Sequence, residues 1–151
     1  MNLRTLDLQL IALVRRWYIP LARLAIFIVY FWFGILKLFN LSPAGPLAAA
    51  LTAKTIGLAH YSLAFHILAV YECVIGVMFL FPKLTRVVIP LLLIHIVIVC
   101  SPLLLVPHLA WQHPFVPTLE GQYIIKNVAI VALAIGLAAH TMPLQAKAKR
   151  R

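Results

Sequence analysis

Long apolar runs separated by short polar breaks dominate this sequence. A helix that crosses the hydrocarbon core of a bilayer needs about 20 mostly apolar residues. Runs of that length predict transmembrane helices at about residues 20–39, 62–81, 87–106 and 122–140. Because helices satisfy their own backbone hydrogen bonds in lipid, we expect one all-α membrane domain over residues 1–151, a polytopic four-transmembrane-helix bundle.

The segments outside these runs have their own patterns. Residues 1–16 mix leucines with polar side chains at a spacing that predicts an N-terminal amphipathic helix on the membrane surface. A cleaved signal peptide is the alternative for the first run, but its length, its Lys37 and the later runs favour a retained helix. Proline and glycine mark 40–61 as a loop, within which 46–60 could form a short, partly re-entrant helix. Residues 107–121 form a second loop.

Composition and charge support a membrane protein. Hydrophobic residues make up 64% of the chain and charged residues 11%, which leaves too few polar side chains to cover a soluble domain. The net charge of +10 sits at the ends of apolar runs, not along an exposed face, so it does not indicate nucleic-acid binding. We expect the basic termini to contact anionic lipids.

The distribution of lysine and arginine predicts the orientation. Four lie in the N-terminal segment, Lys83 and Arg86 lie between the second and third runs, and four lie in the C-terminal tail. Since cytoplasmic loops are rich in these residues, both termini are predicted to be cytoplasmic in a bacterial-type inner (plasma) membrane. The loop at 107–121 is then predicted to face outward.

Cysteines and histidines do not form a recognisable metal or haem site. Cys73 and Cys100 lie singly within apolar runs, where cysteine packs as a small hydrophobe. His66 and His95 differ in predicted depth by about one turn, whereas haem ligands must oppose each other across the ring. We therefore expect no metal, and an interhelical hydrogen bond for His95.

Glu72 lies near the middle of the second predicted span. Placing an ionisable side chain there costs about 2.5–3.5 kcal/mol on insertion scales, so such a group usually faces a partner or a cavity. Two interpretations stay open: a proton-accepting functional group, or a structural ion pair between helices. The candidate site is a polar cluster, facing an outward-opening cavity, that comprises Glu72, Lys37, His95, Lys126, Asn127, Glu120 and His66.

The lysines and the fourth run leave alternatives within this cluster. Lys37 and Lys126 lie close enough to their helix ends for their ammonium groups to reach the interface instead of Glu72. Lys126 lies about 9 Å nearer the outer end of its span than Glu72 does, so a contact needs a lysine that reaches inward. Glu120, Tyr123 and Asn127 recur at i, i+3 and i+7, which predicts a bundle-facing side that either packs or also lines a pocket.

Several short motifs resemble DoxX-like membrane proteins. They are Gly34-x-x-Lys37, Glu72 followed by Gly76, Leu84-Thr85-Arg86, and the run from Glu120 to Asn127, together covering about residues 20–140. The resemblance implies a four-helix membrane bundle associated with respiratory, quinone or thiol redox chemistry. No redox cofactor site is evident in the sequence, so we expect any electron transfer to need a bound quinone or a catalytic partner.

We therefore expect a DoxX-like subunit of a redox or stress-related system. Its expected partners are the lipid bilayer and a membrane or peripheral redox protein, or further copies of itself. Two alternatives stay open: a structural or assembly subunit without activity of its own, and a small transporter. The transporter is disfavoured because four short helices rarely enclose a pathway and no inverted repeat is visible.

Overall fold

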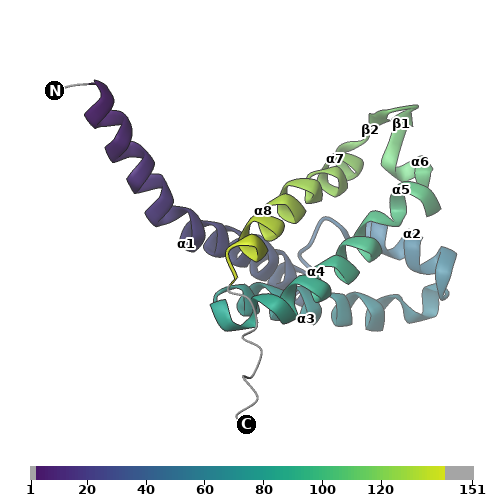
Figure 1. Cartoon of the computed structure of the whole chain (residues 1–151). Helices are drawn as coiled ribbons and strands as arrows, with labels where there is room; N and C mark the ends of the chain where they lie inside the picture. Colours follow the sequence, from purple (N-terminus) through teal and green to yellow (C-terminus); the bar gives the residue numbers. More distant parts are fainter. Residues whose placement is uncertain (1–2, 142–151) are drawn as a thin grey trace, which may run out of the picture.

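The computed structural model describes residues 3–141 and is built almost entirely from helices (Figure 1). The basic C-terminal tail, on which part of the orientation prediction rests, lies outside these residues. In chain order the elements are α1 (Leu3–Leu38), α2 (Gly45–Thr55), the 3₁₀ turn η1 (Leu58–His60), α3 (Tyr61–Phe79), the 3₁₀ turn η2 (Pro82–Leu84), α4 (Thr85–Cys100), α5 (Pro102–Leu105), α6 (Pro107–Ala110), β1 (Trp111–His113), β2 (Val116–Pro117), α7 (Leu119–Ile125) and α8 (Asn127–Ala139).

Four helical stretches are long and apolar enough to cross a membrane, which makes this a multi-pass membrane protein. They run over Leu3–Leu38, Leu58–Phe79, Pro82–Leu105 and Leu119–Ala139. The predicted all-α four-helix bundle is confirmed. The third stretch is divided where α4 ends at Cys100 and α5 begins, and the fourth where α7 gives way to α8.

Helix α1 joins two segments that the sequence pattern separates. The amphipathic N-terminal part and the first span form one helix of 36 residues, which passes through Pro20. At about 1.5 Å per residue this helix is about 54 Å long, well beyond the roughly 30 Å of a hydrocarbon core. Its N-terminal half therefore extends beyond the bundle (Figure 1).

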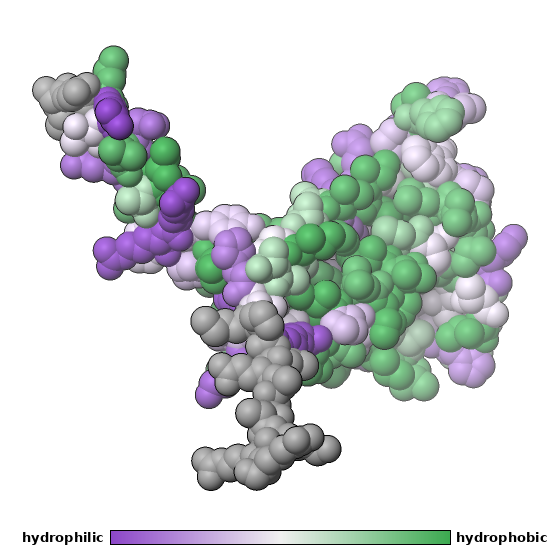
Figure 2. Space-filling view, viewed as in Figure 1, coloured by the Kyte–Doolittle hydropathy of each residue, from purple (hydrophilic) through white to green (hydrophobic). Residues whose placement is uncertain are grey.

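The four spans pack in a closed ring, because α1 contacts α3, α3 contacts α4, α4 contacts α8, and α8 returns to α1. Apolar side chains from all four meet in the centre: Ile26, Ile75, Phe79, Val88, Leu92 and Leu137. Many large apolar side chains also cover the outside of the bundle (Figure 2). In a soluble protein they would be a liability, but in a bilayer they match the lipid tails.

Helices α1 and α3 make the most extensive helix pair, and glycines allow their close approach. A Cβ atom at Gly34 would lie 2.6 Å from the Cys73 sulfur, and one at Gly76 would lie 2.9 Å from the Phe31 backbone nitrogen. Small residues of this kind let helix backbones come together in membranes, where lipid offers no hydrophobic drive for association.

The loop predicted at 107–121 is an ordered cap that contains a small antiparallel hairpin. Strand β1 pairs with β2 through Trp111 and Pro117, and Phe115 turns the chain at φ 63°. Thr118 then begins α7, since its side chain accepts a hydrogen bond from the Gly121 nitrogen at 3.1 Å. The hairpin was not predicted, because its strands are too short for a period-two pattern.

Candidate functional site

Glu72 is buried between three helices and meets a basic group on each carboxylate oxygen. Its side chain projects from the middle of α3, and 4% of the residue is exposed. Lys37 of α1 donates from Nζ to Oε2 at 2.5 Å, and Nε2 of His95 on α4 lies 3.0 Å from Oε1. The predicted mid-depth carboxylate therefore has a charged partner and a second hydrogen-bond partner.

A fourth side chain extends this arrangement. The hydroxyl of Tyr30 on α1 lies 3.1 Å from Nδ1 of His95. When neutral His95 donates from Nε2 to Glu72, its Nδ1 accepts from the Tyr30 hydroxyl, so that both ring nitrogens are satisfied. The four residues Lys37, Glu72, His95 and Tyr30 form a continuous series of hydrogen bonds, called the buried chain below.

The fold places the buried chain through simple helix geometry. Tyr30 and Lys37 are seven residues apart, two turns along α1, so both project from one face toward α3 and α4. The Tyr30 ring also meets the His95 ring edge-on, with centroids 5.1 Å apart. The ring centroid of a second aromatic residue, Tyr71, lies 6.1 Å from that of His95. The Tyr71 hydroxyl donates to the Leu91 carbonyl at 2.9 Å.

The electrostatics of the buried chain are balanced. Lys37 is 8% exposed, and Tyr30 and His95 are each 4% exposed, so the solvent contributes little to stabilising its charges. A lone carboxylate or ammonium at this depth would be strongly unfavourable, whereas the pair offsets that cost if its remaining hydrogen bonds are satisfied. The arrangement can hold a proton in several positions along Tyr30, His95 and Glu72.

The structure does not bring the whole predicted cluster together. Lys126 is exposed and lies over the Tyr123 ring, 4.6 Å from its centroid, whereas Lys37 pairs with the carboxylate of Glu72. Glu120 is exposed at the start of α7, and Asn127 is half-buried beside the α7–α8 junction. His66 hydrogen-bonds the Ser62 carbonyl of its own helix at 2.7 Å. These four residues lie outside the buried chain.

Two residues of structural importance were not singled out by the sequence. Tyr30 could have been found from its position two turns before Lys37. Arg23, one of the four basic residues counted in the N-terminal segment for the orientation, is buried. It donates to the Phe79 carbonyl at 3.0 Å and to the Thr85 hydroxyl at 2.7 Å, where α3 ends and α4 begins. An arginine at a helix C-terminus satisfies carbonyls that lack helical partners.

Two cavities lie along α1, and the buried chain lines neither of them. Both lie between Leu13 and Ala25 of this helix, with volumes of about 400 and 560 Å³. The predicted outward-opening polar cavity at Glu72 does not correspond to either of them. Within residues 3–141, no group of three or more histidine, cysteine or acidic side chains is arranged to hold a metal ion.

Comparisons with family models, with curated proteins and with solved structures found no match to this chain.

Proposed function

We propose that the protein is a DoxX-like membrane subunit of a respiratory, quinone or thiol redox system, in which the buried chain handles protons. One observation carries the proposal: Lys37 and Glu72, which belong to two separate motifs of the resemblance, are in direct contact. Gly34 and Gly76 of the same motifs hold α1 against α3, so that this contact forms. The residues of these two motifs thus all contribute to the contact between α1 and α3.

The chemistry of the buried chain suits a redox partner. Reduction of a quinone or a disulfide takes up protons, and these must come from groups that can lose and regain them inside the membrane. Glu72 and His95 are such groups, and Lys37 stabilises the charge that remains when Glu72 is ionised. Tyr30 would hold the His95 ring in position and relay a proton to Nδ1.

The proposal is tested by purification from native membranes in mild detergent, with identification of co-purifying proteins and quinones. We expect a redox enzyme or a quinone in the preparation, and we expect Glu72→Gln to abolish the associated quinone- or thiol-dependent turnover while the folded protein persists. Glu120→Gln is the matched control, because Glu120 is exposed outside the buried chain. Full turnover by Glu72→Gln would contradict the proposal.

The proposal includes a bacterial-type inner membrane with both termini in the cytoplasm. Lys83 in the turn η2 and Arg86 in the first turn of α4 support this orientation. Single cysteines introduced as Gln112→Cys and Lys83→Cys test it with a membrane-impermeant thiol reagent on intact cells. We expect labelling at 112 alone, and labelling at 83 alone would invert the topology.

A structural or assembly subunit is the second candidate, and the closure of the buried chain favours it. The Glu72 carboxylate has a partner on each oxygen, and both ring nitrogens of His95 are engaged, so the chain is internally satisfied. This candidate predicts that Lys37→Met with Glu72→Leu still binds its partner and supports full turnover of the complex. The redox proposal predicts that the same double variant binds but is inactive.

A further inference from the structure

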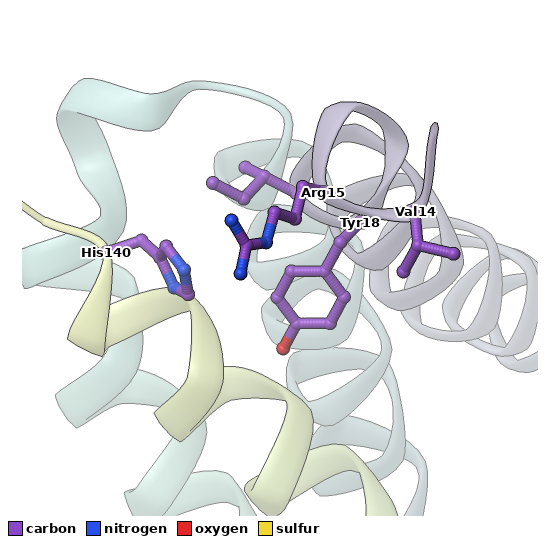
Figure 3. Close-up of a pocket in the computed structure, with 5 residues that line it drawn as sticks. Val14, Arg15, Tyr18 and His140 are labelled. Carbon is purple, nitrogen blue, oxygen red and sulfur yellow. The ribbon is translucent and has the colours of Figure 1, made fainter. Parts of the chain in front are cut away.

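A cavity with a mostly apolar lining lies where α1 leaves the bundle beside the end of α8, and it is called the polar cavity below because three polar side chains reach it. It has a volume of about 400 Å³ and is lined by Val14, Arg15, Tyr18, Ile19 and His140. Figure 3 shows the Arg15 guanidinium directed toward His140, with the Tyr18 hydroxyl directed toward α8. A cation and two further polar side chains thus meet at one end of the transmembrane bundle.

An apolar groove adjoins this cavity. It has a volume of about 560 Å³, shares Val14 and Tyr18 with the polar cavity, and follows α1 as far as Ala25. Trp17, Leu21 and, from α8, Leu133 also line it. Because Ala25 and Leu133 lie further into the spans than Arg15 and His140, the groove leads from the polar cavity toward the hydrocarbon region.

The depth of the polar cavity is fixed by α8. This helix, which completes the fourth membrane-spanning stretch, ends at Ala139, and His140 follows it directly. A residue at the end of a span lies at the headgroup level of the bilayer. Arg15 lines the same cavity as His140 and therefore lies at this level too.

Among the acidic side chains of the described residues, none is placed to act as a counter-ion for Arg15. The sequence contains three acidic side chains, Asp7, Glu72 and Glu120. Glu72 is engaged in the buried chain, and Glu120 lies at the other end of the fourth membrane-spanning stretch. Asp7 is eight residues from Arg15, or about 12 Å along the axis of α1. Among residues 3–141, no ion pair of Arg15 is found.

The two other polar side chains are held in place without using all their donors. The Tyr18 hydroxyl lies against Gly136, where a Cβ atom would collide with it, and within the described part of the chain it has no hydrogen-bond partner. His140 donates from Nδ1 to the Gly136 carbonyl at 2.8 Å, and its ring centroid is 5.8 Å from that of Tyr18. Tyr18 therefore offers a donor next to the Arg15 charge.

From this geometry we infer a binding site for one anionic phospholipid. Arg15 and the Tyr18 hydroxyl bind the phosphate at the headgroup level, and an acyl chain lies in the groove along Trp17, Leu21 and Ala25. Charge complementarity selects this occupant, since an unpaired arginine at the interface attracts an anion and the adjoining groove accepts only an apolar tail. The site is separate from the buried chain, so it stands whether or not the proposed function does.

Native mass spectrometry of the full-length protein with defined lipids tests the site. The protein is exchanged from detergent into mixed micelles with equal amounts of phosphatidylglycerol and phosphatidylcholine. We expect one retained phosphatidylglycerol, and we expect Arg15→Gln to lower its preference over phosphatidylcholine by about fivefold. Arg16→Gln is the matched control, because this variant removes the same charge at the next residue. Arg16 lies near the Trp17 ring and does not line the cavity.

A second variant tests the groove independently of charge. Ala25→Leu places a larger apolar side chain in the groove at an exposed position of α1, so it should leave the fold intact and reduce lipid retention. Equal effects of Arg15→Gln and Arg16→Gln would overturn the site in favour of diffuse attraction to the basic helix. Retention of a quinone in its place, or displacement of the lipid by inorganic phosphate alone, would also overturn it.

Discussion

Removing one partner of the Lys37–Glu72 pair should destabilise the protein far more than removing both. Glu72→Leu leaves the Lys37 ammonium buried without a carboxylate and takes the acceptor from His95 Nε2. Lys37→Met leaves the carboxylate with His95 alone. Breaking a buried ion pair from one side typically costs about 3–5 kcal/mol, whereas apolar replacement of both partners is often close to neutral.

The expected magnitude follows from what each variant leaves behind. Lys37 lies one residue before the end of α1, so its flexible side chain can partly reach the interface, and Glu72→Leu should cost about 3 kcal/mol. In the double variant the only remaining defect is that His95 Nε2 has lost its acceptor. Leaving such a buried group without a partner costs about 1–3 kcal/mol. The coupling free energy between the two positions should therefore be at least about 2 kcal/mol.

The assay is reversible unfolding in mild detergent micelles by increasing mole fraction of dodecyl sulfate, followed by circular dichroism. The double-mutant cycle compares the wild type with both single variants and the double variant. A second cycle with Lys126→Met and Glu120→Leu serves as a control, since those side chains are exposed. Additivity at Lys37 and Glu72 within about 0.5 kcal/mol would refute the reasoning, because it would mean that the pair is not coupled.

Three further outcomes are expected. Gly34→Val should lower the free energy of unfolding by about 3 kcal/mol and Gly34→Ala by less, because even the Cβ atom lies within 3 Å of the neighbouring helix; thermal unfolding in detergent measures both. Arg23→Met should cost about 1.5–3 kcal/mol in the same assay by removing two hydrogen bonds, whereas the exposed Arg16→Met should be close to neutral. Tyr30→Phe should cost only about 1 kcal/mol yet reduce the proposed redox turnover severalfold, and equal losses in the two assays would assign Tyr30 a structural role alone.

The spans and the central carboxylate could be predicted because both follow from the chemistry of hydrocarbon. Twenty apolar residues in a row have few alternatives to a transmembrane helix, and a mid-span glutamate needs a partner. The structure differs from these expectations in α1, where the amphipathic segment and the first span form one helix, and in the third and fourth spans, which are divided at Ser101 and Lys126. Hydrophobic periodicity alone does not show whether a helix continues through a proline.

The partners of Glu72 were harder to predict, because sequence gives depth along a span but not rotation around the bundle. Lys37 and Lys126 are both basic residues near helix ends, and only the packing of α1 against α3 decides between them. Tyr30 was missed because a tyrosine in an aromatic-rich run resembles ordinary core. Arg23 was missed because arginines that flank a span usually serve as interfacial anchors.

The order of the buried chain along the sequence has a consequence for how the protein is made. Lys37 precedes Glu72 by 35 residues, and His95 follows Glu72 by 23. A nascent chain that leaves the ribosome N-terminus first therefore presents the ammonium group before the carboxylate, and the imidazole last. Helices α1 and α3 can enter the lipid as a neutralised hairpin, so that the carboxylate is never inserted alone and α4 docks onto a surface that already carries its acceptor.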